Sequence, residues 1–306
     1  MRTIAMVNQK GGCGKTTTAI NTAAAFAILG KRVLVVDLDP QAHATIGLGF
    51  DPDACRMTMY DALTKADGSL WQVAVPTKLK QLNLAPCNVL LASAELELAG
   101  LRGKELMLAR VLQTVRDKYD ISIIDCPPSI GILTLNALVT STDVIVPVQV
   151  HYYALEGLKR LLETIHIIKE RFHPYSVENI GLLLTFVENR TTFSRQIQQQ
   201  MREIFGDLVF DTVIHRNARL AEAPSAGEPV LTYAPRSRGA ADYRALAAEM
   251  LNSTVPTEEA VGKDRKRGIQ KDLSDIFDGV WIPEKNSSHD SMYSGVATGH
   301  QQYEGT

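Results

Sequence analysis

The feature that most constrains the fold of this chain is a glycine-rich segment between an apolar run and an alanine-rich run. Residues 4–7 are apolar, the glycine-rich segment reads Lys10-Gly-Gly-Cys-Gly-Lys-Thr-Thr17, and residues 16–29 are alanine-rich and followed by Gly30. The pattern predicts a buried strand, a tight loop and a helix in direct succession. Such a loop directs backbone N–H groups and the positive end of a helix dipole to one point, where phosphate groups bind.

The same loop carries side chains suited to a nucleoside triphosphate. Lys15 is placed to contact the β- and γ-phosphates, and the Thr16 hydroxyl is placed to bind Mg²⁺. The usual phosphate loop has a glycine where this chain has Gln9, and a second lysine, Lys10, opens the loop instead. The predicted nucleotide-binding residues of the loop are Lys10, Gly11, Gly12, Cys13, Gly14, Lys15, Thr16 and Thr17.

The rest of the chain alternates apolar runs with helical patterns. The further apolar runs are residues 33–36, 121–124, 144–148 and 180–186, and the helical patterns are residues 155–169, 193–204 and 240–251. Alternation of this kind is typical of an α/β fold. We therefore expect a mostly parallel sheet with helices on both faces.

Composition divides the chain into a body and a tail. Residues 1–252 are predicted to form one domain, and residues 253–306, rich in polar residues, a largely disordered tail. Within the tail, apolar residues at helical spacing predict an amphipathic helix over residues 268–281. The formal net charge of −2 gives no overall attraction to nucleic acid or membrane.

Two further patterns bear on the location of the protein. Its four cysteines are widely separated and have no metal-ligand spacing, and no apolar stretch is long enough for a signal peptide or a membrane span. We therefore expect a cytoplasmic protein with reduced thiols.

Three aspartates follow predicted strands. Asp37 and Asp39 come after the second apolar run, and Asp125 follows the run at residues 121–124. Parallel strands end at one edge of the sheet, where open α/β folds place their ligands. A Mg²⁺–triphosphate site needs a carboxylate near the water shell of the metal and a group that orients the attacking water. These aspartates are the candidates for both roles.

Three segments together resemble the nucleotide motifs of the ParA/MinD branch of deviant Walker ATPases. They are the phosphate loop, Val36-Asp-Leu-Asp-Pro-Gln41 and Ile124-Asp-Cys-Pro-Pro128. Two later segments, Arg216-Asn-x-Arg-Leu-x-Glu-Ala-Pro-Ser225 and Arg236-Ser-Arg-Gly239, are similar to the Soj-like partition ATPases. The resemblance covers about residues 1–251. The chain departs from the family at Cys13, usually valine, and at Ala42-His43, often Gly-Asn.

The resemblance implies a role for each motif residue. Lys10, Lys15 and Asp39 would be catalytic, and Lys10 would cross a homodimer interface to the phosphates bound by the partner. ATP and Mg²⁺ would be the cofactors. Thr16, Asp37, Asp39 and Asp125 would surround the metal, with Asp125 in the Walker B role and Asp39 positioning the water. Asn217 would contact the nucleotide from the loop that holds the adenine.

The resemblance also implies non-specific DNA binding. The segment between Arg190 and Arg244 contains eight arginines and no lysine, although composition alone leaves open whether these form a solvated face or a phosphate-binding face. We expect DNA contacts at Arg190, Arg195, Arg216 and Arg219. The implied function is chromosome or plasmid segregation by a nucleoid-associated ATPase whose hydrolysis a ParB-like protein stimulates.

Three alternatives remain open. A MinD-like ATPase for division-site placement would bind membrane through the tail helix, but three aspartates on the polar face of that helix make membrane binding the less favoured prediction. A positioning ATPase with a protein cargo would share the mechanism and differ only in its partner. An electron-transfer relative would need cysteines that bridge a cluster across a dimer, and no cysteine here lies in a matching motif.

Overall fold

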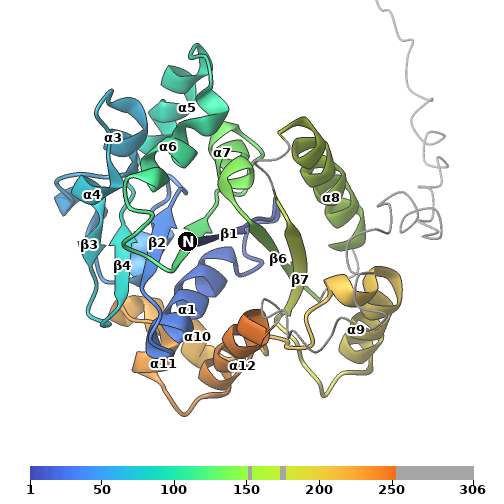
Figure 1. The fold of residues 1–306 in the computed structure, drawn as a ribbon. Coiled ribbons are helices and arrows are strands. Elements are labelled where there is room, and N and C mark those ends of the chain that lie inside the picture. The colour runs from blue at the N-terminus through green and yellow to red at the C-terminus, as the bar shows by residue number, and fades with distance from the viewer. Residues whose placement is uncertain (151–153, 173–176, 253–306) are drawn as a thin grey trace, which may run out of the picture.

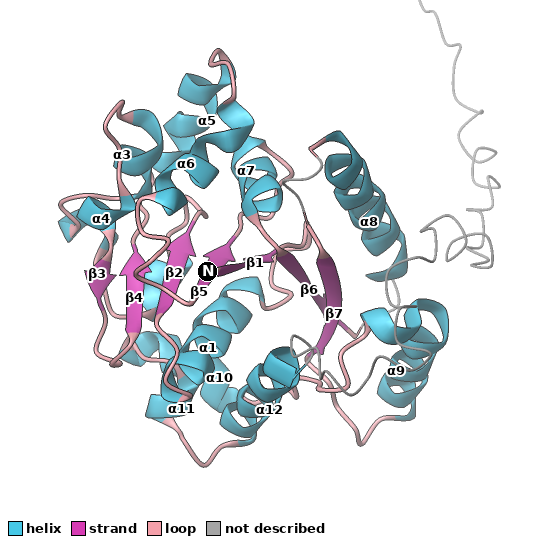
Figure 2. Ribbon diagram, in the orientation of Figure 1, coloured by secondary structure: helices cyan, strands magenta, loops and turns pink. Residues whose placement is uncertain are grey.

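The computed structural model describes residues 1–150, 154–172 and 177–252. The predicted tail and its helix at residues 268–281 lie outside this range. The described part contains a seven-stranded sheet in the order β3-β4-β2-β5-β1-β6-β7 (Figures 1 and 2). The strands are β1 (Arg2–Met6), β2 (Val33–Asp37), β3 (Val75–Pro76), β4 (Leu82–Ala85), β5 (Ile121–Asp125), β6 (Asp143–Gln149) and β7 (Asn179–Thr185).

All strand pairs are parallel except the short antiparallel pair of β3 with β4. The prediction of a mostly parallel sheet is thereby confirmed. The five apolar runs of the sequence are β1, β2, β5, β6 and β7, with bounds shifted by one or two residues. β7 ends at Thr185, because Phe186 adopts a left-handed conformation with φ 55° that interrupts the strand.

Helices follow most strands. They are α1 (Lys15–Ile28), α2 (His43–Gly47), α3 (Met59–Thr64), α4 (Leu70–Val73), α5 (Leu91–Ala99), α6 (Met107–Gln113), α7 (Ile132–Thr140), α8 (Ala154–Arg171), α9 (Thr192–Phe205), α10 (Ala218–Glu222), α11 (Val230–Tyr233) and α12 (Arg238–Asn252). Short 3₁₀ segments occur at η1 (Pro52–Ala54), η2 (Lys104–Leu106), η3 (Gly206–Leu208) and η4 (Ala223–Ala226). The helices predicted from the sequence are α1, α8, α9 and α12.

The sheet is buried on both faces. In β1, Ile4 and Met6 pack into one hydrophobic cluster, whereas Ala5 and the following Val7 pack into the other. Helices α1, α11 and α12 cover the first face, and α3, α5, α6, α7 and α8 cover the second (Figure 1). Because side chains alternate along a strand, a strand covered on both faces reads as a continuous apolar run, as the sequence pattern indicated.

Candidate nucleotide site

The carboxyl edge of the sheet brings the sequence motifs together. β1 leads into the glycine-rich loop, β2 ends at Asp37 and β5 ends at Asp125. Asp125 is the register partner of Met6 on one side and of Asp37 on the other. Parallel pairing of three neighbouring strands therefore places the loop and both carboxylates next to each other, although the two aspartates lie far apart in the sequence.

The glycine-rich loop is anchored to two neighbouring strands. Asn8 donates from Nδ2 to the carbonyl of Pro147 in β6 at 2.7 Å and accepts the backbone N–H of Lys10 at 3.0 Å. The hydroxyl of Thr185, the last residue of β7, donates to the carbonyl of Cys13 at 2.9 Å. Sequence reasoning did not identify Asn8 or Thr185, although a polar residue at the end of an apolar run is a usable signal.

The backbone of the loop requires glycine. Gly12 and Gly14 have φ of 72° and 96°, a left-handed conformation that side chains disfavour. A Cβ atom at Gly11 or Gly12 would meet nothing within 4 Å, so the loop borders open space. Helix α1 begins at Lys15 and has no side-chain cap. Its first N–H groups and the dipole of a 14-residue helix are therefore available to an anion.

Three side chains of the loop have distinct environments. Lys15 is buried, and its Nζ lies 3.4 Å from the carbonyl oxygen of Lys10. Lys10 is exposed, and among the described residues its ammonium group has no acidic partner. Cys13 is fully buried, and burial raises the pKa of its thiol, so it acts as a packing residue beside the glycines.

The two carboxylates at the sheet edge differ in their hydrogen bonds. Asp37 Oδ2 accepts the backbone N–H and the hydroxyl of Thr45 at 2.8 and 2.7 Å, and Oδ1 accepts the N–H of Asp39 at 3.2 Å. Both oxygens of Asp125 are buried, and neither has a hydrogen-bond partner among the described residues. Asp37 is thus engaged in holding its own loop, whereas Asp125, beside Thr16, has no partner within hydrogen-bond distance in the described part of the chain.

Burial dominates the titration of both groups. It raises the pKa of Asp37 to about 7, against the hydrogen bonds from Thr45. It raises the pKa of Asp125 well above its usual range, the charge of Asp37 adds to this effect, and Thr16 and Lys15 act in the opposite direction. Negative charge at this edge is therefore unfavourable until a cation compensates it.

Asp39 lies where the loop after β2 turns toward α2. Its Oδ1 accepts the N–H of Gln41 at 3.0 Å, and its carbonyl accepts the N–H of Ala42 at 2.8 Å and the thiol of Cys87 at 3.2 Å. Ala42 has φ 54°, a left-handed conformation before α2. Ala42 is the first residue of the Ala42-His43 pair, which stands where the family often has Gly-Asn. A glycine would be less strained at this position.

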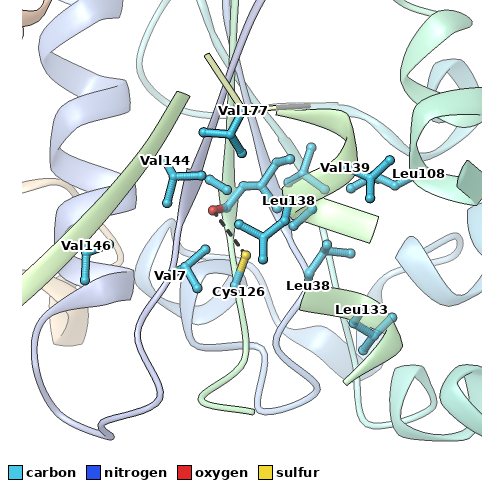
Figure 3. Packing of buried hydrophobic residues seen from close by; sticks show 14 of the residues in the cluster. Val7, Leu38, Leu108, Cys126, Leu133, Leu138, Val139, Val144, Val146 and Val177 are labelled. Carbon is cyan, nitrogen blue, oxygen red and sulfur yellow. Dashed lines mark hydrogen bonds between the residues drawn. The ribbon is translucent and has the colours of Figure 1, made fainter. Parts of the chain in front are cut away.

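Cys126 follows Asp125 and belongs to the core. Figure 3 shows its thiol among aliphatic side chains that include Val7 and Leu38. The thiol lies 4.0 Å from the carbonyl oxygen of Ile124. Burial raises the pKa of Cys126 well above its usual range. Cys87 is also fully buried. Neither thiol is accessible for a cluster shared between two subunits, as the electron-transfer alternative requires.

A pocket of about 440 Å³ adjoins the loop; we call it the Gly14 pocket. It is lined by Gly14, Thr17, Thr185, Phe186, Ile214, His215, Arg216, Asn217, Ala218, Leu220, Ala221 and Tyr243. Asn217 caps α10, and its Oδ1 accepts the N–H of Arg219 at 2.9 Å. The pocket has mostly apolar walls beside a phosphate loop, which suits the base and ribose of a nucleotide. Phe186 and Tyr243 carry no motif, so sequence reasoning missed them.

The four arginines predicted to bind DNA are all exposed. Arg216 is paired with Glu188 at 2.9 Å and Arg219 with Glu222. Arg190, in the loop after β7, and Arg195, on α9, have no acidic partner within residues 1–150, 154–172 and 177–252. Their assignment to DNA stays a prediction.

Comparison with known proteins agrees with this geometry. A model of the AAA domain family matches residues 1–177. The chain is 45% identical over 247 residues to the sporulation initiation inhibitor protein Soj of Bacillus subtilis, a match that covers 81% of this chain and 97% of Soj. It is 42% identical over 255 residues to the chromosome partitioning protein ParA of Myxococcus xanthus, covering 83% of this chain and 89% of that protein.

A solved structure agrees as well. The structure of cobyrinic acid a,c-diamide synthase from Mycobacterium smegmatis with a bound ATP analogue and magnesium has a TM-score of 0.72 and 36% identity, and the match covers 82% of this chain and 95% of that chain. The fold and the loop define a P-loop ATPase. The chain belongs to the ParA/Soj family of these ATPases.

Proposed function

We propose that this protein is a partition ATPase that binds ATP with Mg²⁺, dimerises, and binds DNA without sequence preference. The observation that supports it best is the arrangement at one sheet edge. There the open glycine loop, the unpartnered carboxylate of Asp125 and the Gly14 pocket adjoin. The loop suits the phosphates of ATP, Asp125 suits the cation, and the pocket suits the nucleoside.

The residues of the site fit a magnesium–nucleotide complex. Within the described ranges no group of three or more His, Cys, Asp or Glu side chains is placed to hold a metal ion, so the phosphates and water would supply most ligands. Thr16 would add its hydroxyl and Asp125 would hold the water shell. Asp37 would act mainly by fixing the loop of Asp39. Bound Mg²⁺ would supply charge compensation for the triphosphate.

Hydrolysis requires an oriented water and a stabilised leaving group. Asp39 would position the water, because one of its carboxylate oxygens is engaged by Gln41 and the other has no described partner. Lys15 would stay on the β- and γ-phosphates. Lys10 is exposed and lacks an acidic partner among the described residues, which leaves its charge available to the phosphates of a second subunit. Dimerisation would then depend on ATP.

The ATP-bound dimer would bind DNA phosphates through Arg190, Arg195, Arg216 and Arg219 and would be nucleoid-associated in the cytoplasm. A ParB-like protein would stimulate hydrolysis and release the dimer from DNA. Similarity to proteins named for chromosome partitioning supports this assignment over the diamide synthase reaction, because identity to the chromosome partitioning protein ParA of Myxococcus xanthus, at 42%, exceeds the 36% to the synthase. The cargo would be a chromosome, a plasmid or a protein complex.

The decisive experiment is sedimentation of the Asp39→Ala variant with duplex DNA or with anionic liposomes, in ATP and in ADP. We expect the variant to bind ATP, to hydrolyse it at least about 100-fold more slowly, and to pellet with DNA only in ATP. None of the described helices is both long and apolar enough to cross a bilayer. ATP-dependent pelleting with liposomes instead of DNA would favour the MinD-like alternative.

Two controls make the result specific. Asp53→Ala removes an exposed acid from the 3₁₀ segment after α2 and should hydrolyse ATP like the unmodified protein. Lys15→Ala should abolish both ATP binding and pelleting. Retention of ATP-driven dimerisation by Lys15→Ala would contradict the phosphate-loop assignment.

A further inference from the structure

A polar cluster lies behind the Gly14 pocket and has no part in the function proposed above. Asp242 Oδ2 accepts the backbone N–H of His215 at 2.9 Å and lies 3.0 Å from its Nδ1. His215 Nε2 lies 3.1 Å from Nη2 of Arg238 and 3.0 Å from Nδ2 of Asn189. Arg238 Nε also donates to Asp242 Oδ1 at 3.4 Å. Side chains from α12 and from the β7–α9 loop thus contact the imidazole ring of His215.

The partners of His215 determine its tautomer. A guanidinium group only donates hydrogen bonds, so Nε2 must be the accepting, unprotonated nitrogen. The proton is therefore on Nδ1, which donates to the carboxylate of Asp242. The side chains of His215 and Asp242 are only 14% and 9% exposed, so water competes little for the bonds between these two residues. Every polar atom of the imidazole and both oxygens of Asp242 are engaged.

The cluster holds one wall of the pocket. His215, Arg216 and Asn217 are consecutive lining residues. The backbone N–H of Val187 donates to the carbonyl oxygen of Ile214 at 3.0 Å, and the backbone N–H of Arg216 donates to the carbonyl oxygen of Val187 at 3.1 Å. These two bonds and the bond from His215 N–H to Asp242 fix the backbone of the wall at three successive residues. None of the cluster residues belongs to the phosphate loop.

We propose that Asp242 and Arg238 are positioning residues for the nucleoside half of the bound nucleotide and act through His215. This inference rests on the proposed ATP site. It assigns to α12 a role in binding the base and ribose, whereas the phosphate loop binds the triphosphate. The neighbouring Tyr243 supports the same assignment, because it lines the pocket and lies 3.2 Å from the Thr18 hydroxyl of α1.

The variant Asp242→Asn tests the proposal with little change in shape. If its amide oxygen faces His215, its NH₂ group faces the Nε–H of Arg238. If the amide is flipped, the NH₂ group faces the backbone N–H of His215. In either orientation the NH₂ group of the asparagine faces another hydrogen-bond donor, so the variant cannot restore the hydrogen bonds of the cluster. Arg238→Ala removes one of the two partners of Nε2 from an exposed position, the first residue of α12, and is the milder test.

The measurement compares the affinities of ATP and inorganic tripolyphosphate, both with Mg²⁺, by calorimetry, together with KM and kcat for ATP. For Asp242→Asn we expect ATP affinity to fall about tenfold, with tripolyphosphate affinity unchanged, a raised KM and an unchanged kcat. Arg238→Ala should weaken ATP binding by roughly twofold to fivefold. Arg244→Ala is the matched control, because Arg244 is also on α12 but its hydrogen bond, among the residues that the structure describes, goes to the carbonyl of Pro235.

Two results would overturn the inference. One is unchanged ATP affinity in both Asp242→Asn and Arg238→Ala, and the other is an equal loss of ATP and tripolyphosphate binding in both. Failure of the proposed function looks different, because the unmodified protein would then bind neither ATP nor tripolyphosphate. That outcome would remove the site itself and this inference with it.

Discussion

Asp125 lies in an environment that is unfavourable for its own charge. Its carboxylate is buried at the end of β5 and lacks hydrogen-bond partners within the described chain, next to a second carboxylate, Asp37. A buried group left without partners costs about 1–3 kcal/mol, and more when charged. The protein tolerates this cost at the edge where a cation is expected to bind, which is typical of functional sites.

We predict that Asp125→Asn stabilises the nucleotide-free protein and abolishes Mg²⁺-dependent hydrolysis. Burial raises the pKa of Asp125, so the native carboxyl retains a proton that the unfolded chain releases above pH of about 4. The unmodified protein therefore loses stability as pH rises, and the neutral asparagine does not. The midpoint of thermal unfolding should rise by roughly 2–6 °C at pH 8 and by less at pH 5.

The matched variant is Asp37→Asn, for which we expect the midpoint of thermal unfolding to fall instead of rise. Both oxygens of Asp37 accept N–H groups, from Thr45 and Asp39. An NH₂ group would oppose a donor in either orientation, so this variant should be less stable than the unmodified protein. Equal shifts for the two variants would mean that the difference between their hydrogen bonds has no energetic consequence.

At the scale of elements, the packing of α1 against α12 links the phosphate loop to the end of the described chain. Ala19 and Ala23 of α1 are fully buried in the same cluster as Leu246 and Ala247 of α12. Small residues allow close approach of the two helices. The polar contact within this interface is between Thr18 and the fully buried Tyr243. Burial raises the pKa of Tyr243, so the phenol stays neutral.

We predict that Tyr243→Phe lowers the free energy of unfolding by about 0.5–1.5 kcal/mol, because the buried Thr18 hydroxyl loses its partner while the ring still packs. Urea unfolding would measure the change. The double variant with Thr18→Val should cost less than the sum of the two single variants, because both groups of the pair are then removed. Additive losses would indicate that the two hydroxyls do not interact.

At the scale of the whole molecule, the four arginines proposed to bind DNA differ in whether a carboxylate already occupies their guanidinium group. Arg216 and Arg219 are paired with glutamates, whereas Arg190 and Arg195 have no acidic partner among the described residues. A paired arginine must leave its carboxylate before it can contact DNA. The unpaired arginines should therefore contribute more to the affinity, although all are exposed.

We predict that Arg190→Ala weakens binding of the ATP-bound protein to duplex DNA more than Arg219→Ala does. Each should reduce the slope of log affinity against log salt by about 1 for every DNA phosphate that the arginine no longer neutralises, and neither should change ATP affinity. Fluorescence anisotropy over a salt series would measure the slopes. Arg116→Ala, in an exposed position before β5, is the control and should keep the full slope. Unchanged slopes for Arg190→Ala and Arg219→Ala would place the DNA surface elsewhere.

Much of the backbone of the candidate nucleotide site could be predicted because its signals are local. The loop at residues 10–17 has glycines that permit left-handed backbone at Gly12 and Gly14, and the apolar runs next to it are long enough to identify strands. β4 could not be predicted in this way. Asn83 interrupts its apolar residues, so the segment shows no continuous apolar run, and its place in the sheet depends on pairing with β2.

The sequence by itself determined the phosphate loop, the parallel α/β class and the family, because each depends on the order and spacing of neighbouring residues. The tertiary structure alone decided that Asp37 accepts hydrogen bonds and that Asp125 accepts none from the described residues. It alone brought Asp242 to His215 and Tyr243 to Thr18, which is 225 positions away in the sequence. Such contacts follow from strand register and helix packing, which bring distant residues together and leave no periodic trace in the chain.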